Sequence, residues 1–74
     1  MKEDCFEIVF QVTETLRNGK ERTFKKKVLS PRFRNGRYIT EADSTAKGIE
    51  LLQSMHYYRI KYLYRTCKTL YWTE

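Results

Sequence analysis

The first dozen residues of this chain of 74 constrain its fold most strongly. Every second residue from Phe6 to Val12 is apolar, which is the pattern of a strand with one buried face. Asn18-Gly19 follows a few residues later, and this dipeptide is a strong signal for a hairpin turn. The chain is therefore predicted to begin with an antiparallel β-hairpin.

Two turn geometries at Asn18-Gly19 give different strand registers. A two-residue turn would set Val12 opposite Lys25, whereas a three-residue turn with a G1 bulge at the glycine would set Val12 opposite Phe24. Only the bulged register places the apolar residues of both strands on one face, because a slip of one residue turns a strand over. We predict the bulged register, with the second strand over about residues 21–29.

A turn-rich segment separates this hairpin from the next regular element. Pro31 is expected to end the second strand, because it has no N–H and restricts the residue before it. Residues 32–40 contain a second turn, Asn35-Gly36, followed by a short extended return. We predict a loop with a tight turn here.

A helix is predicted over about residues 41–55. Thr40 and Asp43 fit a capping box, and Ser44 is the alternative N-cap. Gly48 costs about 1 kcal/mol in a helix interior, so we expect the helix to approach the sheet closely there. The apolar stripe expected to face the sheet is Ala46, Ile49, Leu52 and Met55, with Leu51 beside it.

The last segment, residues 57–72, alternates again and favours a β conformation. It forms either one long strand or two strands broken near residues 66–68, and no Gly or Pro decides between them. The predicted fold class is α+β, a ββαβ antiparallel sheet with an optional fourth strand and one helix on one face. With 41% apolar residues we expect a single domain over residues 1–74, which is too small for the large α/β enzyme folds.

Cysteine usage and hydropathy suggest where such a chain would reside. Cys5 and Cys67 are expected to be reduced thiols of the first and last strands. They could form a disulfide only if these two strands are neighbours and the medium is oxidising. Two cysteines and one histidine are too few for a structural zinc site. We expect neither export by a signal peptide nor a membrane span, because no apolar run is long enough.

The formal net charge of +6 is concentrated in residues 21–38, which hold seven basic residues and one acidic residue. Such a patch can bind a phosphate backbone, protect an exposed strand edge, or dock onto an acidic protein surface. The three interpretations remain open at this point. The predicted basic patch comprises Arg22, Lys25, Lys26, Lys27, Arg32, Arg34 and Arg37.

Aromatic residues are concentrated in the last segment of the chain, residues 57–72. About half of them are expected to pack against the helix, and the rest to lie on the uncovered face of the sheet. Tyrosine and tryptophan are enriched in protein–protein interfaces. The predicted protein interface comprises Tyr58, Tyr62, Tyr64, Tyr71 and Trp72.

The chain carries little that resembles catalytic chemistry. His56 and Cys67 could form a nucleophile pair, but a pair without an orienting group, an oxyanion site and a cleft is no active site. The three glycines lie too far apart for a phosphate-binding loop. We expect a protein that is not an enzyme, with no catalytic, cofactor or metal residues and no cofactor.

Residues 33–43 read F-x-N-G-x-Y-x-T-x-x-D, and a helix and a basic, aromatic strand follow. This pattern resembles one found in small tailed-bacteriophage proteins, many of them capsid auxiliary, decoration or head-fibre components of the virion. The resemblance implies a structural role without catalytic residues. It also implies a location in the virion or the cytoplasm of a bacterial host.

The function expected from the sequence is that of a small structural or interaction protein of a phage particle. Its partners would be capsid or connector proteins, with self-association as a further option. The alternatives are a basic nucleic-acid-binding module or small regulator, and a phage inhibitor of a host defence system. Steep salt dependence of nucleic-acid binding would favour the first alternative.

Overall fold

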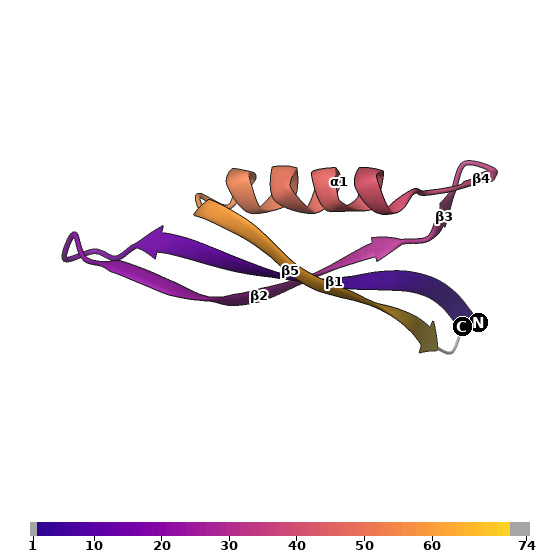
Figure 1. The fold of residues 1–74 in the computed structure, drawn as a ribbon, viewed down its shortest axis with the longest axis horizontal. Coiled ribbons are helices and arrows are strands. Elements are labelled where there is room, and N and C mark those ends of the chain that lie inside the picture. Colours follow the sequence, from indigo (N-terminus) through magenta and orange to yellow (C-terminus); the bar gives the residue numbers. More distant parts are fainter. Residues whose placement is uncertain (1, 72–74) are drawn as a thin grey trace.

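The computed structural model describes residues 2–71, which form a three-stranded antiparallel sheet with one helix on one face (Figure 1). The elements are β1 (Lys2–Thr15), β2 (Glu21–Pro31), β3 (Phe33–Arg34), β4 (Arg37–Tyr38), α1 (Glu41–Ser54) and β5 (Tyr58–Tyr71). The strand order is β2-β1-β5, so that β1 is central, and β3 and β4 form a separate two-stranded sheet. The predicted α+β class is confirmed.

The first hairpin adopts the predicted bulged register. Val12 lies opposite Phe24, and Ile8 lies opposite Val28. Gly19 has φ +82° and its N–H donates to the carbonyl oxygen of Leu16 at 2.9 Å. A left-handed residue at this place costs little only when it is glycine, which is why Asn18-Gly19 determines the register.

Strand β2 is longer than predicted, since it continues through Pro31, which lies opposite Cys5. The next residue, Arg32, donates its N–H to the carbonyl oxygen of Asp4 at 3.2 Å. Hydrogen-bonding residues alternate along an antiparallel pair, so the nitrogen of Pro31 points away from β1. Because β2 is an edge strand, the missing N–H interrupts no ladder there.

The segment before the helix contains the predicted second turn. Asn35 and Gly36 have φ values of +54° and +81°, as in a type I′ turn, and connect β3 to β4. The rings of Phe33 and Tyr38 meet edge to face on this small hairpin, with centroids 5.2 Å apart.

Helix α1 is capped as predicted but presents a different face to the sheet. The Thr40 hydroxyl accepts the N–H of Asp43 at 3.1 Å. The buried helix residues are Ser44, Gly48 and Leu52, and Ile49 is half-buried. The predicted stripe is therefore partly wrong: Ala46, Leu51 and Met55 are exposed. The helix is rotated toward its smallest side chains because these allow it to lie close to the sheet.

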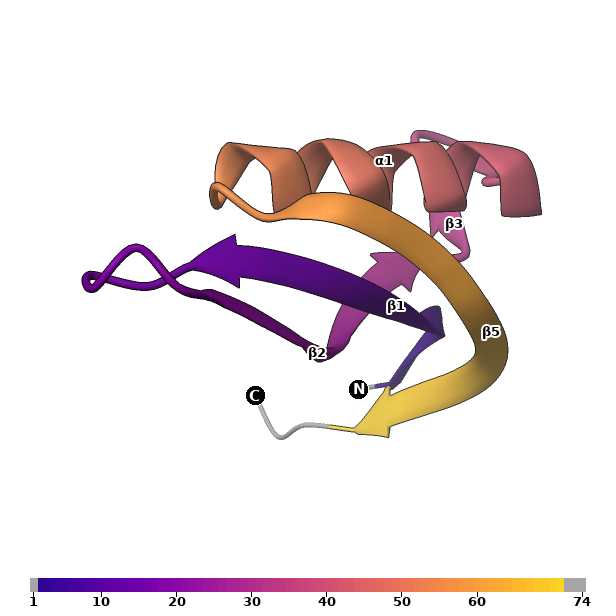
Figure 2. The same ribbon diagram turned by 60° about the vertical axis from the view of Figure 1, so that its left-hand side comes forward.

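The core lies between α1 and one face of the sheet. Its buried members are Phe6, Ile8, Phe10, Val12, Val28 and Leu52, with Phe24, Ile49, Tyr57 and Ile60 packed against them. Strand β5 is one continuous strand, which resolves the alternative left open by the sequence. It curls strongly from the end of the helix around to the far side of β1 (Figure 2). Two register shifts against β1 accompany this curl, and bulges bend and twist a strand in this way.

The two cysteines lie on neighbouring strands but on opposite faces. Cys5 is opposite Lys68, whereas Cys67 is opposite Phe6, one position away along β1. Adjacent residues of a strand point to opposite faces, so the two thiols face away from each other. Both are free, Cys5 buried and Cys67 exposed. Within residues 2–71, α1 is neither long nor apolar enough to cross a membrane.

Candidate functional site

A bulge in β5 decides which tyrosines share a face. Tyr64 lies opposite Val9 and Tyr62 lies opposite Phe10, so Leu63 is an extra residue between them. Residues directly opposite each other share a face. Because neighbouring residues of β1 point to opposite faces, Tyr62 is on the side of the helix and Tyr64 is on the other side.

The predicted aromatic residues therefore do not form one surface. Tyr62 packs its ring against Phe10 with centroids 6.3 Å apart, and Tyr71 is exposed opposite Lys2 at the far end of β1. Tyr58 faces away from the helix and donates its hydroxyl to Glu21 at 2.8 Å. The remaining member of the predicted interface, Trp72, lies outside the described residues.

We call the side of the sheet away from α1 the open face, and define it by two rows of residues across the three strands. Gln11 lies between Lys25 and Lys61 in one row. In the next row, Val9 lies between Lys27 and Tyr64. Val9 is only 2% exposed, whereas Tyr64 is 50% exposed. The open face therefore has a buried Val9 flanked by Lys27 and Tyr64, and an exposed Gln11 flanked by Lys25 and Lys61.

The positive charge of the open face is only partly neutralised. Glu7 accepts a hydrogen bond from Lys68 at 3.1 Å and lies 3.7 Å from the ammonium of Lys27. This hydrogen bond, reinforced by both positive charges, lowers the pKa of the Glu7 carboxyl. Lys25 and Lys61 have no carboxylate within 4.0 Å among the described residues. Their charges are available to a partner.

The predicted basic patch is divided among several parts of the fold. Only Lys25 and Lys27 belong to the open face, because strand residues alternate between faces. The other members have different surroundings: Arg22 pairs with Glu14 and lies over the Phe24 ring, Lys26 lies over Tyr57, Arg32 lies over Phe6, and Arg34 and Arg37 are on β3 and β4. The seven residues do not form a single continuous surface.

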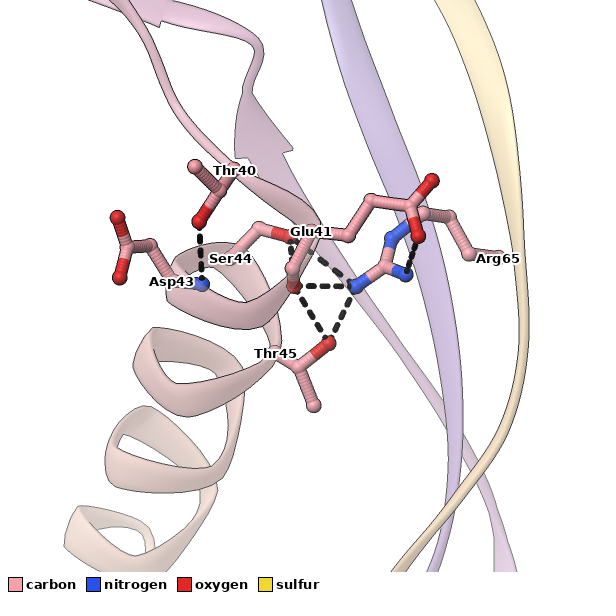
Figure 3. A network of polar contacts seen from close by, with 6 residues as sticks. All are labelled: Thr40, Glu41, Asp43, Ser44, Thr45 and Arg65. Atoms are coloured by element: carbon pink, nitrogen blue, oxygen red, sulfur yellow. Dashed lines mark hydrogen bonds and ion pairs between the residues drawn. The ribbon is translucent and has the colours of Figure 1, made fainter.

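Arg65 positions the helix on the sheet, and sequence reasoning did not single it out. Its side chain is only 10% exposed. One guanidinium nitrogen donates to the carbonyl oxygen of Glu41 at 2.8 Å, to the hydroxyl of Ser44 at 3.1 Å and to the hydroxyl of Thr45 (Figure 3). The other terminal nitrogen lies 3.4 Å from the Glu41 carboxylate.

Arg65 reaches this position because of the same bulge. Simple alternation along β5 would place it on the face opposite Tyr62, but Leu63 shifts the register and both face the helix. Its guanidinium carbon lies 5.1 Å from the centroid of the Phe6 ring and 5.3 Å from that of Tyr62. The signal available in the sequence was the pair of hydroxyl residues, Ser44 and Thr45, in the first helical turn.

The open face offers charged and aromatic groups for binding. Residues 2–71 contain no group of three or more His, Cys, Asp or Glu side chains placed to hold a metal ion. The fold and the site define a small α+β protein with a helix-covered face and a basic, tyrosine-bearing open face. Comparison of the chain with protein-family models, curated proteins and solved structures finds no match.

Proposed function

We propose that this chain is a non-enzymatic interaction protein that docks through its open face onto an acidic surface of a larger protein. The observation that carries the proposal is the row Lys25–Gln11–Lys61, whose two lysines lack a carboxylate partner among the described residues. Complementary charge accelerates association and excludes partners of the wrong sign.

The neighbouring row supplies the contact area that charge alone does not. Tyr64 is half-exposed beside the buried Val9, and tyrosine offers a large apolar ring together with a polar hydroxyl. Neighbouring strands are about 4.8 Å apart, so Lys25 and Lys61 emerge about 10 Å from each other across β1. A partner with two carboxylates at this spacing could pair with both lysines while covering the tyrosine.

The biological setting that we propose is a tailed-phage particle. The support for this part is the resemblance of residues 33–43 to phage virion proteins. In the fold this motif forms the β3–β4 hairpin and the Thr40 cap of α1. The partner would then be a capsid or connector protein.

Quantitative mass spectrometry of purified phage particles tests this function. The chain is expected at a copy number that matches the symmetry of the capsid or connector. The double variant Lys25→Glu/Lys61→Glu is expected to be incorporated poorly, because both charges of the row are reversed. Lys20→Glu is the matched control, since Lys20 is exposed in the β1–β2 turn away from the row. Absence of the wild-type chain from particles would refute the virion role.

Single-stranded nucleic acid is the second candidate partner, favoured by Tyr64 among lysines. An exposed ring can stack on a base while lysines contact phosphates. Binding of a thymidine oligonucleotide that falls log-linearly with salt, and is lost in Tyr64→Ala, would support this candidate. Absence of oligonucleotide binding at low salt would eliminate it.

A further inference from the structure

Strand β2 leaves one row of backbone groups unpaired in the described fold. It is the edge of the sheet, and Arg32 donates to Asp4, which fixes the even-numbered residues of β2 as those bonded to β1. Because the pattern alternates, the odd-numbered residues point their N–H and C=O groups outward. The residues with outward N–H groups include Thr23, Lys25, Lys27 and Leu29. Such an edge is a template for an added strand.

A groove of about 400 Å³ lies beside the C-terminal half of this edge. The edge of β2, the β3–β4 hairpin and one side of α1 enclose it. Apolar surface is available there, since Leu51 is half-exposed and Ile39 and Ala46 also line the groove. Charged residues of both signs surround the groove, so it does not favour side chains of either charge. The groove therefore suits the apolar side chains of a ligand.

We propose that an extended, acidic segment of a partner protein adds to β2 as a fourth strand of the sheet. Its acidic side chains lie opposite Lys25 and Lys27, on the open face, because residues directly opposite each other share a face. The intervening side chains point toward the helix and are apolar, so that those opposite Val28 and Ser30 enter the groove. Main-chain hydrogen bonds supply affinity and the alternating side chains supply specificity. The inference deepens the proposed function, on which it rests, by naming the edge at which a protein partner pairs.

The charges of β2 disfavour the pairing of two copies of the chain in the register centred on Lys26. An antiparallel pair of β2 strands centred on Lys26 would set each Lys25 opposite the Lys27 of the other copy. Like charges directly opposite each other destabilise a strand pair. Pro31 offers no outward N–H, so such pairing could not continue past it. The same lysines attract a strand with carboxylates at alternate positions.

The test uses a fluorescein-labelled peptide of about ten residues in which Glu and Val alternate. Fluorescence anisotropy with the full chain is expected to show saturable binding. The matched control is the same peptide with N-methyl groups on the amides that would pair with β2. This control keeps the charge but cannot form the ladder, and we expect it to bind at least about tenfold more weakly. Equal binding of the two peptides overturns the proposal.

Amide hydrogen exchange identifies the edge that is used. The peptide is expected to protect the N–H groups of Thr23, Lys25, Lys27 and Leu29. The N–H groups of Lys26 and Val28 already point to β1 and should change little. Protection confined to β5, or none in β2, overturns the proposal.

Two variants separate this inference from docking through the open face. Lys25→Glu, which breaks no ion pair in the described fold, is expected to weaken peptide binding about fivefold, because one attractive cross-strand pair becomes repulsive. Lys61→Glu, which lies on β5 at the other edge of the sheet, should leave peptide binding unchanged. If the peptide fails to bind while Lys25→Glu/Lys61→Glu still reduces incorporation into particles, strand addition is wrong and the proposed function stands.

Discussion

Gly48 lies directly over the ring of Phe10: a Cβ atom built on the glycine would come within 2.9 Å of both Cε2 and Cζ of that ring. The ring is completely buried, so it cannot move aside without disturbing the core. This contact sets how closely α1 approaches the sheet. It also explains a glycine that is unfavourable for the helix taken alone.

Gly48→Ala is expected to lower the free energy of unfolding by about 1 kcal/mol. Overpacking a core costs about 1–3 kcal/mol, whereas the better helix propensity of alanine returns about 1 kcal/mol. Urea unfolding followed by circular dichroism would show a lower midpoint. Lys47→Ala, at the exposed neighbouring position, serves as the control and should change the midpoint little. A midpoint raised by Gly48→Ala would contradict the close approach.

Arg65→Lys is expected to lower stability by about 1–3 kcal/mol, because an ammonium group cannot replace the planar guanidinium that joins Glu41, Ser44 and Thr45. Hydrogen exchange in α1 should accelerate more than exchange in β1. Glu41→Gln is the matched comparison, because the Glu41 carboxylate is largely exposed and an exposed ion pair contributes only about 0–1 kcal/mol. Equal losses in the two variants would show that the ion pair, and not the hydrogen bonds from the guanidinium, holds the helix.

Glu7 is expected to make the stability of the fold sensitive to acid. Its pKa is lowered in the folded chain by the hydrogen bond from Lys68 and by the charges of Lys68 and Lys27. The stabilisation is therefore present above the ordinary carboxyl pKa of 4.5 and is lost as the pH falls through the lowered folded value. Glu7→Gln should be less stable than wild type at pH 7, and the difference should disappear in acid. A difference that stays constant down to pH 2 would exclude this linkage.

The two thiols are expected to react at very different rates. Burial raises the pKa of the Cys5 thiol, as does the negative charge of Glu3, and the thiolate is the reactive form. Cys67 is exposed. Titration of the native chain with Ellman's reagent at pH 8 should modify one thiol rapidly and the second only on unfolding. In Cys67→Ser the rapid phase should disappear, and two equally rapid thiols would contradict the buried position of Cys5.

Local signals in the sequence were sufficient to predict several elements, because the interactions that form these elements are themselves local. Gly19 supplies the left-handed residue that fixes the hairpin register, and the Thr40 hydroxyl caps the helix four residues after the Asn35-Gly36 turn ends. Each of these depends on the conformational preference or hydrogen-bonding reach of one or two residues. The prediction of close approach at Gly48 succeeded for a related reason, since its cost to the helix requires compensation elsewhere.

The face of β5 could not be predicted in the same way. Leu63 belongs to a run that alternates without interruption, and nothing in the run marks it as the extra residue of a bulge. The bulge accompanies the curl of β5 around β1, and this curl is a property of the assembled sheet. Simple alternation along the sequence therefore puts Tyr62 and Tyr64 on the same face, whereas the structure places them on opposite faces. For the same reason the sequence did not identify Arg65 as a residue that positions the helix.

The sequence by itself determined the order of elements, the register of the first hairpin, the helix cap and the excess of positive charge, because each is encoded within a few neighbouring residues. Only the tertiary structure decided that β1 lies between β2 and β5, which places Lys25 and Lys61 on either side of Gln11. The reason is that strand pairing and helix orientation minimise the exposed apolar area of the whole chain, and no short segment contains that information.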